Sequence, residues 1–203
     1  DVLKVCDRAL ALDPMPDVRG ALLTLRAEAC RWAGDTTMAS DDATVALTLL
    51  PPGSKEWLMA IRTSGHASSF GGLRGRLPSL ASQLLDVPIR DEVAGEYVIA
   101  ATQVASGAIV SGMRDLGFRI LERVASFDPK TFEDDPGVMA RLHSCAGLRA
   151  YDRGDYEWLL TEQIAMVNCH ARAGDDRSSL TQRVNVAFAL MMMGAFEEAI
   201  EGL

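Results

Sequence analysis

Two interleaved series of helix-breaking residues divide the 203-residue chain at nearly constant intervals. Glycines stand at positions 34, 71, 112, 154 and 194, at spacings of 37, 41, 42 and 40 residues. Prolines stand at positions 14, 51, 88 and 129, at spacings of 37, 37 and 41 residues. Because glycine and proline interrupt helices, two series with one shared period predict a repeating unit of helix, glycine turn, helix and proline-marked loop.

The segments between these breaks carry helical patterns. Between Asp135 and Arg153, apolar residues recur three and four positions apart, and no run in the chain alternates as a half-buried strand would. Asp135 followed by Pro136 is typical of a helix start, with an N-cap and a proline in the first turn. We therefore expect an all-α fold. The predicted helices span 1–12, 17–33, 36–50, 54–70, 74–86, 91–111, 114–127, 135–153, 156–172, 178–193 and 196–203.

The residues around the breaks resemble the tetratricopeptide repeat, a hairpin of helices A and B with small residues where the two helices cross. Segments 6–14, 146–156 and 186–199 carry parts of the pattern. The period of 37–42 residues is longer than the family's period of about 34, and Arg76 stands where a small residue is expected. The long period is similar to that of repeat arms in bacterial kinases, ATPases and transcription regulators. The fullest match is made by Ala27, Gly34, Asp35, Ala39, Ala46 and Pro51.

The resemblance implies a right-handed superhelical solenoid of antiparallel helix hairpins, forming one domain over 1–203, because a single hairpin cannot bury its own apolar face. It implies a non-catalytic scaffold that binds a peptide or protein in its concave groove, as a regulatory part of a larger bacterial signalling protein. The alternative is a structural spacer or self-association arm of a multidomain kinase, ATPase or transcription regulator. Because the chain begins and ends in apparent mid-helix, we expect it to be a fragment. The expected units are a partial helix B over 1–14, hairpins over 17–51, 54–88, 91–129 and 135–172, and a partial hairpin over 178–203.

The groove-facing positions of each helix A follow from the same resemblance. An arginine beside an aromatic residue suits an extended acidic or carboxyl-terminal peptide, and Trp and Arg often dominate interface energetics. For each single residue, a solvated helix face is the other interpretation. The partner-binding residues implied are Glu28, Arg31, Trp32, Arg62, Gln103, Arg141, Tyr151, Asp152 and Asn185, with Ser69, Thr102, Ser106 and Phe188 as further groove positions.

The net charge argues against two classes of partner, and the cysteine usage indicates the cellular compartment. A net charge of −8 argues against nucleic acid, whose phosphates need an excess of positive charge, and against an anionic membrane surface. No segment reaches the roughly 18 uninterrupted apolar residues of a membrane span. Cys6, Cys30, Cys145 and Cys169 lie in apolar stretches without C-x-x-C spacing, which predicts reduced core thiols in a cytoplasmic protein.

No catalytic, cofactor or metal motif stands out, so we expect neither an enzyme nor a cofactor nor a metal site. The segment 71–76 resembles a phosphate-binding loop but lacks its lysine and preceding strand, which favours a helix turn over anion binding. The pairs His143 with Cys145 and Cys169 with His170 lack metal-ligand spacing. We interpret them as core thiols beside partly exposed histidines.

Two further clusters have simple interpretations. Acidic residues at 41–42, 133–135 and 175–176 are expected at helix starts or on exposed faces, where the helix dipole and water stabilise them. The methionine run 191–193 is expected in the core, with an adaptable binding surface as the alternative.

Overall fold

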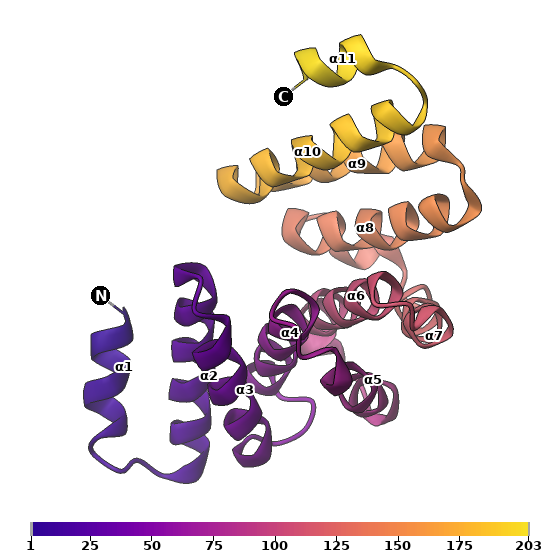
Figure 1. The fold of residues 1–203 in the computed structure, drawn as a ribbon. Coiled ribbons are helices and arrows are strands. Elements are labelled where there is room, and N and C mark those ends of the chain that lie inside the picture. Colours follow the sequence, from indigo (N-terminus) through magenta and orange to yellow (C-terminus); the bar gives the residue numbers. More distant parts are fainter. Residues whose placement is uncertain (1, 203) are drawn as a thin grey trace. The chain divides into compact units, whose positions relative to one another are not determined.

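A computed structural model describes residues 2–202, and within them the chain is all-α, with helices joined by short loops and no strand (Figure 1). The all-α class predicted from the sequence is confirmed. The α-helices are α1 (Val2–Leu10), α2 (Pro16–Ala33), α3 (Thr36–Leu49), α4 (Lys55–Phe70), α5 (Leu77–Asp86), α6 (Ala94–Val110), α7 (Arg114–Val124), α8 (Pro136–Arg153), α9 (Tyr156–Arg172), α10 (Asp176–Met192) and α11 (Phe196–Glu201).

Most predicted helix limits lie close to these bounds, and the main differences are three short 3₁₀ helices. The turn η1 (Arg74–Arg76) precedes α5 and η2 (Asp91–Val93) precedes α6, so both helices begin three residues later than predicted. The turn η3 (Pro129–Phe132) leads towards α8. Short 3₁₀ turns are common at helix ends because they tighten the first or last turn.

The turns between paired helices share one local structure, a glycine that ends the first helix and an aspartate that caps the second. At Gly34 and Gly154 the backbone enters the left-handed region, with φ of 86° and 70°, which closes α2 and α8 at little steric cost for glycine. The predicted start of α8 at Asp135 and Pro136 is confirmed. Four aspartates cap helices by accepting a hydrogen bond of 3.0 Å from the backbone N–H three residues ahead: Asp35, Asp135, Asp155 and Asp175.

The chain divides into two compact units, Asp1–Arg123 (unit 1) and Val124–Leu203 (unit 2). In unit 1, α1 packs against α2, α2 against α3 and α4, α3 against α4, and α4 and α5 against α6. In unit 2, α9 packs against both α8 and α10, and α10 against α11. The single domain predicted over 1–203 stays a prediction.

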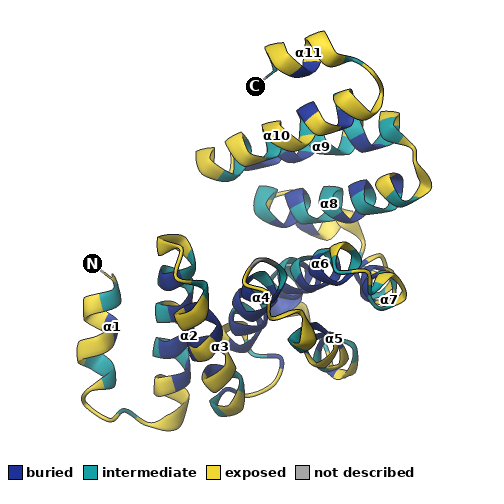
Figure 2. Cartoon of the chain, in the orientation of Figure 1, coloured by how far each residue is buried: buried dark blue, intermediate teal, exposed yellow. Residues whose placement is uncertain are grey.

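The core of unit 1 is densest along α4 and α6, whose ribbons are largely dark blue in Figure 2. Its largest fully buried side chains include Trp57 and Tyr97. Small residues let α4 and α7 lie close to α6. A Cβ on Gly65 would lie 2.8 Å from Cγ2 of Val104, and one on Gly117 would lie 2.5 Å from Cγ1 of Ile109. The small residues matched to helix crossings in the sequence, Ala27, Ala39 and Ala46, are all buried.

Helix α5 ends without a glycine, and Arg123 of α7 satisfies its last carbonyls instead. The guanidinium donates to the backbone oxygens of Leu84 (2.8 Å), Leu85 and Val87. It also lies over the ring of Tyr97, 5.3 Å from the ring centroid, and the Tyr97 hydroxyl donates to the same Leu84 oxygen at 3.1 Å. Burial raises the pKa of Tyr97 to about 12, so this hydroxyl keeps its proton.

One stretch of the described residues, Asp91–Val110, is long and apolar enough to cross a membrane by length and composition. Most of this stretch is buried in the core of unit 1, as the core helix of a globular unit would be. The four cysteines are also buried with free thiols, which confirms their predicted core positions.

Candidate functional site

A polar cluster joins α2 to α4 and is built on one carboxylate, that of Glu28. Arg31 donates to both of its oxygens, at 2.7 and 3.1 Å, and Arg62 of α4 lies 2.9 Å from Oε1. The indole N–H of Trp32 and the hydroxyl of Thr63 each donate to the carboxylate at 3.1 Å. We call these five residues the Glu28 cluster. It contains four of the nine predicted partner-binding residues: Glu28, Arg31, Trp32 and Arg62.

The electrostatics of the Glu28 cluster favour the ionised carboxylate. Burial by itself would raise the pKa of Glu28, but the hydrogen bond from Arg31, the charges of Arg62 and Arg31 and the Thr63 hydroxyl outweigh it and lower the pKa to about 2. Two guanidinium groups face one carboxylate, so the three charged groups carry one net positive charge. The cluster therefore suits an additional acidic group from a partner better than a basic one.

The aromatic member of the cluster is exposed but held in place. The Trp32 side chain is 43% exposed. Its ring face is covered by Arg31, whose guanidinium carbon lies 4.0 Å from the ring centroid, and its N–H is bound by Glu28. The sequence places Glu28, Arg31 and Trp32 on one helix, and spacings of three and four residues bring them to one face. Arg62 joins them because α4 packs against α2.

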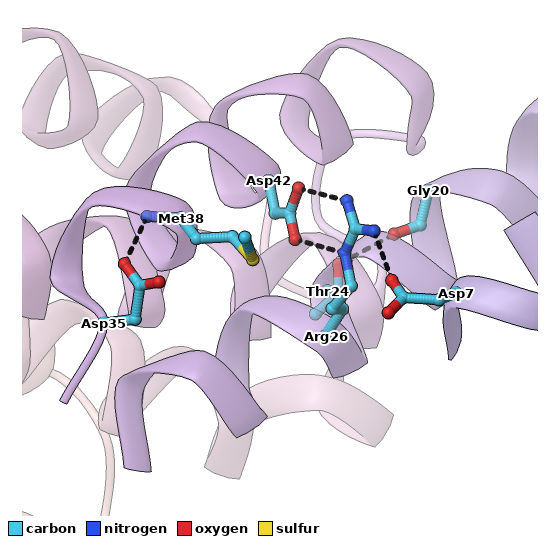
Figure 3. Close-up of polar contacts among 7 residues, drawn as sticks. All are labelled: Asp7, Gly20, Thr24, Arg26, Asp35, Met38 and Asp42. Atoms are coloured by element: carbon cyan, nitrogen blue, oxygen red, sulfur yellow. Dashed lines mark hydrogen bonds and ion pairs between the residues drawn. The ribbon is translucent and has the colours of Figure 1, made fainter. Parts of the chain in front are cut away.

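A second ion-pair cluster in unit 1 has a structural role (Figure 3). Arg26 of α2 binds both carboxylate oxygens of Asp42 on α3, at 2.7 and 2.8 Å, and one oxygen of Asp7 on α1 at 2.7 Å. The hydrogen bonds that Arg26 donates to Asp42 raise the pKa of Arg26 further above its usual value, so the guanidinium stays charged. Asp42 is buried, so the prediction of a solvated acidic pair at 41–42 holds for Asp41 and is wrong for Asp42.

The other five predicted partner-binding residues lie on other helices. Gln103 is half-buried on α6, next to Gly65 of α4. In unit 2, Arg141, Tyr151 and Asp152 lie on α8, and Asn185 lies on α10. The exposed ring of Tyr151 lies 6.1 Å from that of Phe188, another predicted groove residue, and the Asn185 amide donates to Gln182 at 2.7 Å. None of these side chains is buried.

Besides Asp42, the predictions for two single residues and for the methionine run are wrong. Thr102 was expected in the groove, but it is buried and its hydroxyl donates to the backbone oxygen of Val98 at 2.7 Å, within its own helix. His170 was expected to be partly exposed, but it is buried, and its Nδ1 lies 3.8 Å from Asp175. The methionines 191–193 were expected in the core, but all three are exposed at the end of α10.

The segment that resembles a phosphate-binding loop is a helix turn in which the second arginine is engaged. Arg76 donates to the hydroxyls of Ser40 and Thr44 on α3, the latter at 2.7 Å. Among residues 2–202, no group of three or more His, Cys, Asp and Glu side chains could hold a metal ion.

Sequence reasoning missed one cluster in unit 2. Glu162 of α9 accepts a hydrogen bond from the Trp158 indole at 2.9 Å, and its other oxygen lies 2.7 Å from Nδ1 of His143 on α8. The four-residue spacing of Trp158 and Glu162 was a visible signal, because it mirrors the spacing of Glu28 and Trp32. The participation of His143 depends on packing between helices.

Comparison of the chain with protein-family models, with curated proteins and with solved structures gave no match. The likeness to tetratricopeptide repeats thus stays a prediction that the residue pattern carries.

Proposed function

We propose that this chain is a non-catalytic helical-repeat scaffold that binds a protein or peptide segment on the α2–α4 surface around Trp32. In this proposal the hairpins continue as a superhelical solenoid, and α2 and α4 are the A helices of adjacent units. The observation that carries the proposal is the exposed Trp32 side chain, held by Arg31 on its face and by Glu28 at its N–H.

The physical reason is pre-organisation. Binding costs free energy when flexible side chains are immobilised, about 0.5–1.5 kcal/mol for each. The Trp32 ring and the Arg31 guanidinium are already ordered by Glu28, so a partner meets an aromatic and cationic surface with much of that cost already met. Large aromatic residues and arginines are also the usual centres of binding energy in protein interfaces.

The chemistry of the partner follows from the cluster's composition. The net positive charge of Glu28, Arg31 and Arg62 favours a segment with an acidic side chain or a terminal carboxylate. The exposed indole favours an apolar or aromatic side chain next to that acid. The wider setting, a regulatory part of a larger bacterial signalling protein, is proposed from the repeat pattern, and a cytoplasmic location is proposed from the cysteine usage.

A random peptide library displayed on phage tests the proposal. Peptides selected on the purified chain are synthesised, and their affinities for the parent, Trp32→Ala, Trp32→Phe and Val110→Ala are measured by fluorescence anisotropy. Val110 is the matched control, because it is 75% exposed on α6 and lies outside the Glu28 cluster. We expect Trp32→Ala to weaken binding about tenfold or more, Trp32→Phe to retain part of the affinity, and Val110→Ala to change little.

Two results contradict the proposal. One is a library that yields no specific binder to the folded parent chain. The other is a set of binders whose affinities for Trp32→Ala and the parent are equal. Because Trp32 is a surface residue, circular dichroism should show Trp32→Ala with the helical content of the parent, so lost binding is not lost folding.

A further inference from the structure

Helix α2 carries an exposed apolar stripe along most of its length. Its five members stand alternately four and three residues apart: Val18, Leu22, Leu25, Ala29 and Trp32. Val18 and Leu25 are each 48% exposed, and Leu22 and Ala29 are half-buried. Residues at this spacing lie on one side of a helix, so the five side chains form a continuous line. We call them the α2 stripe.

Packed helices border the α2 stripe on two sides. With about 3.6 residues per turn, Arg26 and Glu28 lie on opposite flanks of the stripe. On one flank, Arg26 binds Asp7 of α1 at 2.7 Å (Figure 3). On the other flank, Glu28 binds Arg62 of α4 at 2.9 Å. The stripe is therefore exposed although α2 has a helix packed on each flank.

The spacing of the α2 stripe suits an α-helical partner. Alternating steps of four and three residues are the pattern of a coiled-coil seam, in which side chains of one helix insert between those of the other. Each residue adds about 1.5 Å along the axis, so successive stripe residues lie about 5 Å apart on average. Side chains on one face of an extended peptide lie about 6.6 Å apart, so they lose register with the stripe within a few positions. A partner helix of about 15 residues would follow the whole stripe.

The two ends of the α2 stripe favour opposite charges on a partner. At the Trp32 end, the Glu28 cluster carries one net positive charge. At the other end, Asp17 is exposed, and within residues 2–202 it takes part in no ion pair. The nearby Asp13 is already paired with Arg19 at 3.5 Å. An acidic partner residue therefore suits the Trp32 end, and a basic one suits the Asp17 end.

We propose that the partner segment of the proposed function, on which this inference rests, is an amphipathic α-helix lying along the α2 stripe. It carries an acidic residue beside Trp32 and a basic residue beside Asp17. Its apolar residues, three and four positions apart, insert between those of the stripe. Ala29 is small, so a large apolar side chain of the partner fits between Leu25 and Trp32. One helix buries less than the roughly 1,200 Å² of stable complexes, so we expect a dissociation constant on the order of 10 µM.

Peptides of about 16 residues, selected from a random phage library on the purified chain, are the probes. Their affinities for the parent, Val18→Gln, Leu25→Gln, Trp32→Ala and Val110→Gln are measured by fluorescence anisotropy. Val110→Gln is the control, because it removes an exposed apolar side chain outside the stripe. We expect Leu25→Gln to weaken binding about tenfold, Val18→Gln about fivefold and Val110→Gln about twofold at most. Glutamine keeps helix propensity, and circular dichroism checks the fold of each variant.

The conformation of the bound peptide is measured separately. The Cα chemical shifts of an isotope-labelled peptide should become helical when it binds the chain. Proline is then placed at a central peptide position that tolerates alanine, because proline breaks a helix but fits an extended peptide. We expect this proline to weaken binding about a hundredfold. Asp17→Asn should weaken binding about threefold at about 0.05 M sodium chloride, and less at about 1 M.

Each contrary outcome has a distinct meaning. Binders that lose affinity for Trp32→Ala but bind Leu25→Gln like the parent overturn the α2 stripe and leave the proposed function standing. Extended chemical shifts in the bound peptide, or tolerance of the central proline, overturn the helical partner. An unchanged affinity for Asp17→Asn overturns the order of charges. A parent chain that dimerises at about 10 µM in sedimentation velocity, and is monomeric as Leu25→Gln, places a second copy on the stripe and also overturns the proposal. A library without binders contradicts the proposed function, and this inference with it.

Discussion

Replacing Glu28 by glutamine tests the electrostatic centre of unit 1. Glutamine keeps the shape of the protonated carboxyl group but removes the charge that Arg31 and Arg62 share. A pKa lowered from 4.5 to about 2 corresponds to about 3 kcal/mol of stabilisation by the ionised form. Part of the carboxylate reaches water, where screening weakens ion pairs, so we expect Glu28→Gln to lose about 2 kcal/mol at pH 7.

The pH dependence gives the same prediction an independent check. The pKa of Glu28 is lower in the folded chain than in the unfolded chain, so the folded state gains stability that is fully present above about pH 4.5. That stability is lost as the pH falls through 4.5 towards 2. At about pH 3 the difference in unfolding free energy between parent and variant should therefore shrink to less than half of its value at pH 7.

Urea unfolding followed by far-ultraviolet circular dichroism at pH 7 and pH 3 measures both quantities. Glu122→Gln is the matched control, because it removes the same charge from an exposed position on α7. It should change the unfolding free energy by no more than about 0.5 kcal/mol. The reasoning is refuted if Glu28→Gln is as stable as the parent at pH 7, or if its deficit is the same at both pH values.

Three further changes test the packing of the helices, each by urea unfolding. Gly117→Ala should cost about 1–3 kcal/mol of unfolding free energy, because the new Cβ would overlap atoms of α6. Gly75→Ala is the control and should be near neutral, because no atom lies within 4 Å of its new Cβ. Equal effects of the two changes would contradict the close approach of α7 to α6. Arg123→Met should cost about 2 kcal/mol, because the backbone oxygens of Leu85 and Val87 lose the donor that Arg123 supplies, whereas Leu84 keeps its bond from Tyr97. An unchanged midpoint would rule out that role. Burial and the charge of Arg141 lower the pKa of His170 in the folded chain, so the free energy of unfolding should fall as the pH drops below about 6.5. His170→Gln should reduce that fall. The same pH profile in the parent and the variant would contradict this prediction.

The contacts of Glu28 show which part of the candidate site could be predicted from the sequence and which part could not. Its contacts with Arg31 and Trp32 follow from spacing on one helix, and the sequence named all three as groove residues. Its contacts with Arg62 and Thr63 join residues more than thirty positions apart. These depend on how α4 packs against α2. The sequence therefore indicated the exposed aromatic and the charges, but not the shared carboxylate that orders them.

The sequence by itself determined the helices and their turns. Gly34 and Gly154 end helices because glycine enters the left-handed region without strain, and Asp135 begins one because its carboxylate reaches the backbone N–H three residues ahead. Each of these signals acts within about one helical turn, so it can be read from neighbouring residues alone.

Only the tertiary structure decided burial and exposure for several side chains. Asp42 is buried because Arg26, sixteen residues earlier, meets it across two helices, whereas its neighbour Asp41 stays in water. The methionines 191–193 are exposed although their composition is that of a core. The physical reason is the same in both cases: burial depends on which distant helix covers a face, and no local residue pattern carries that information.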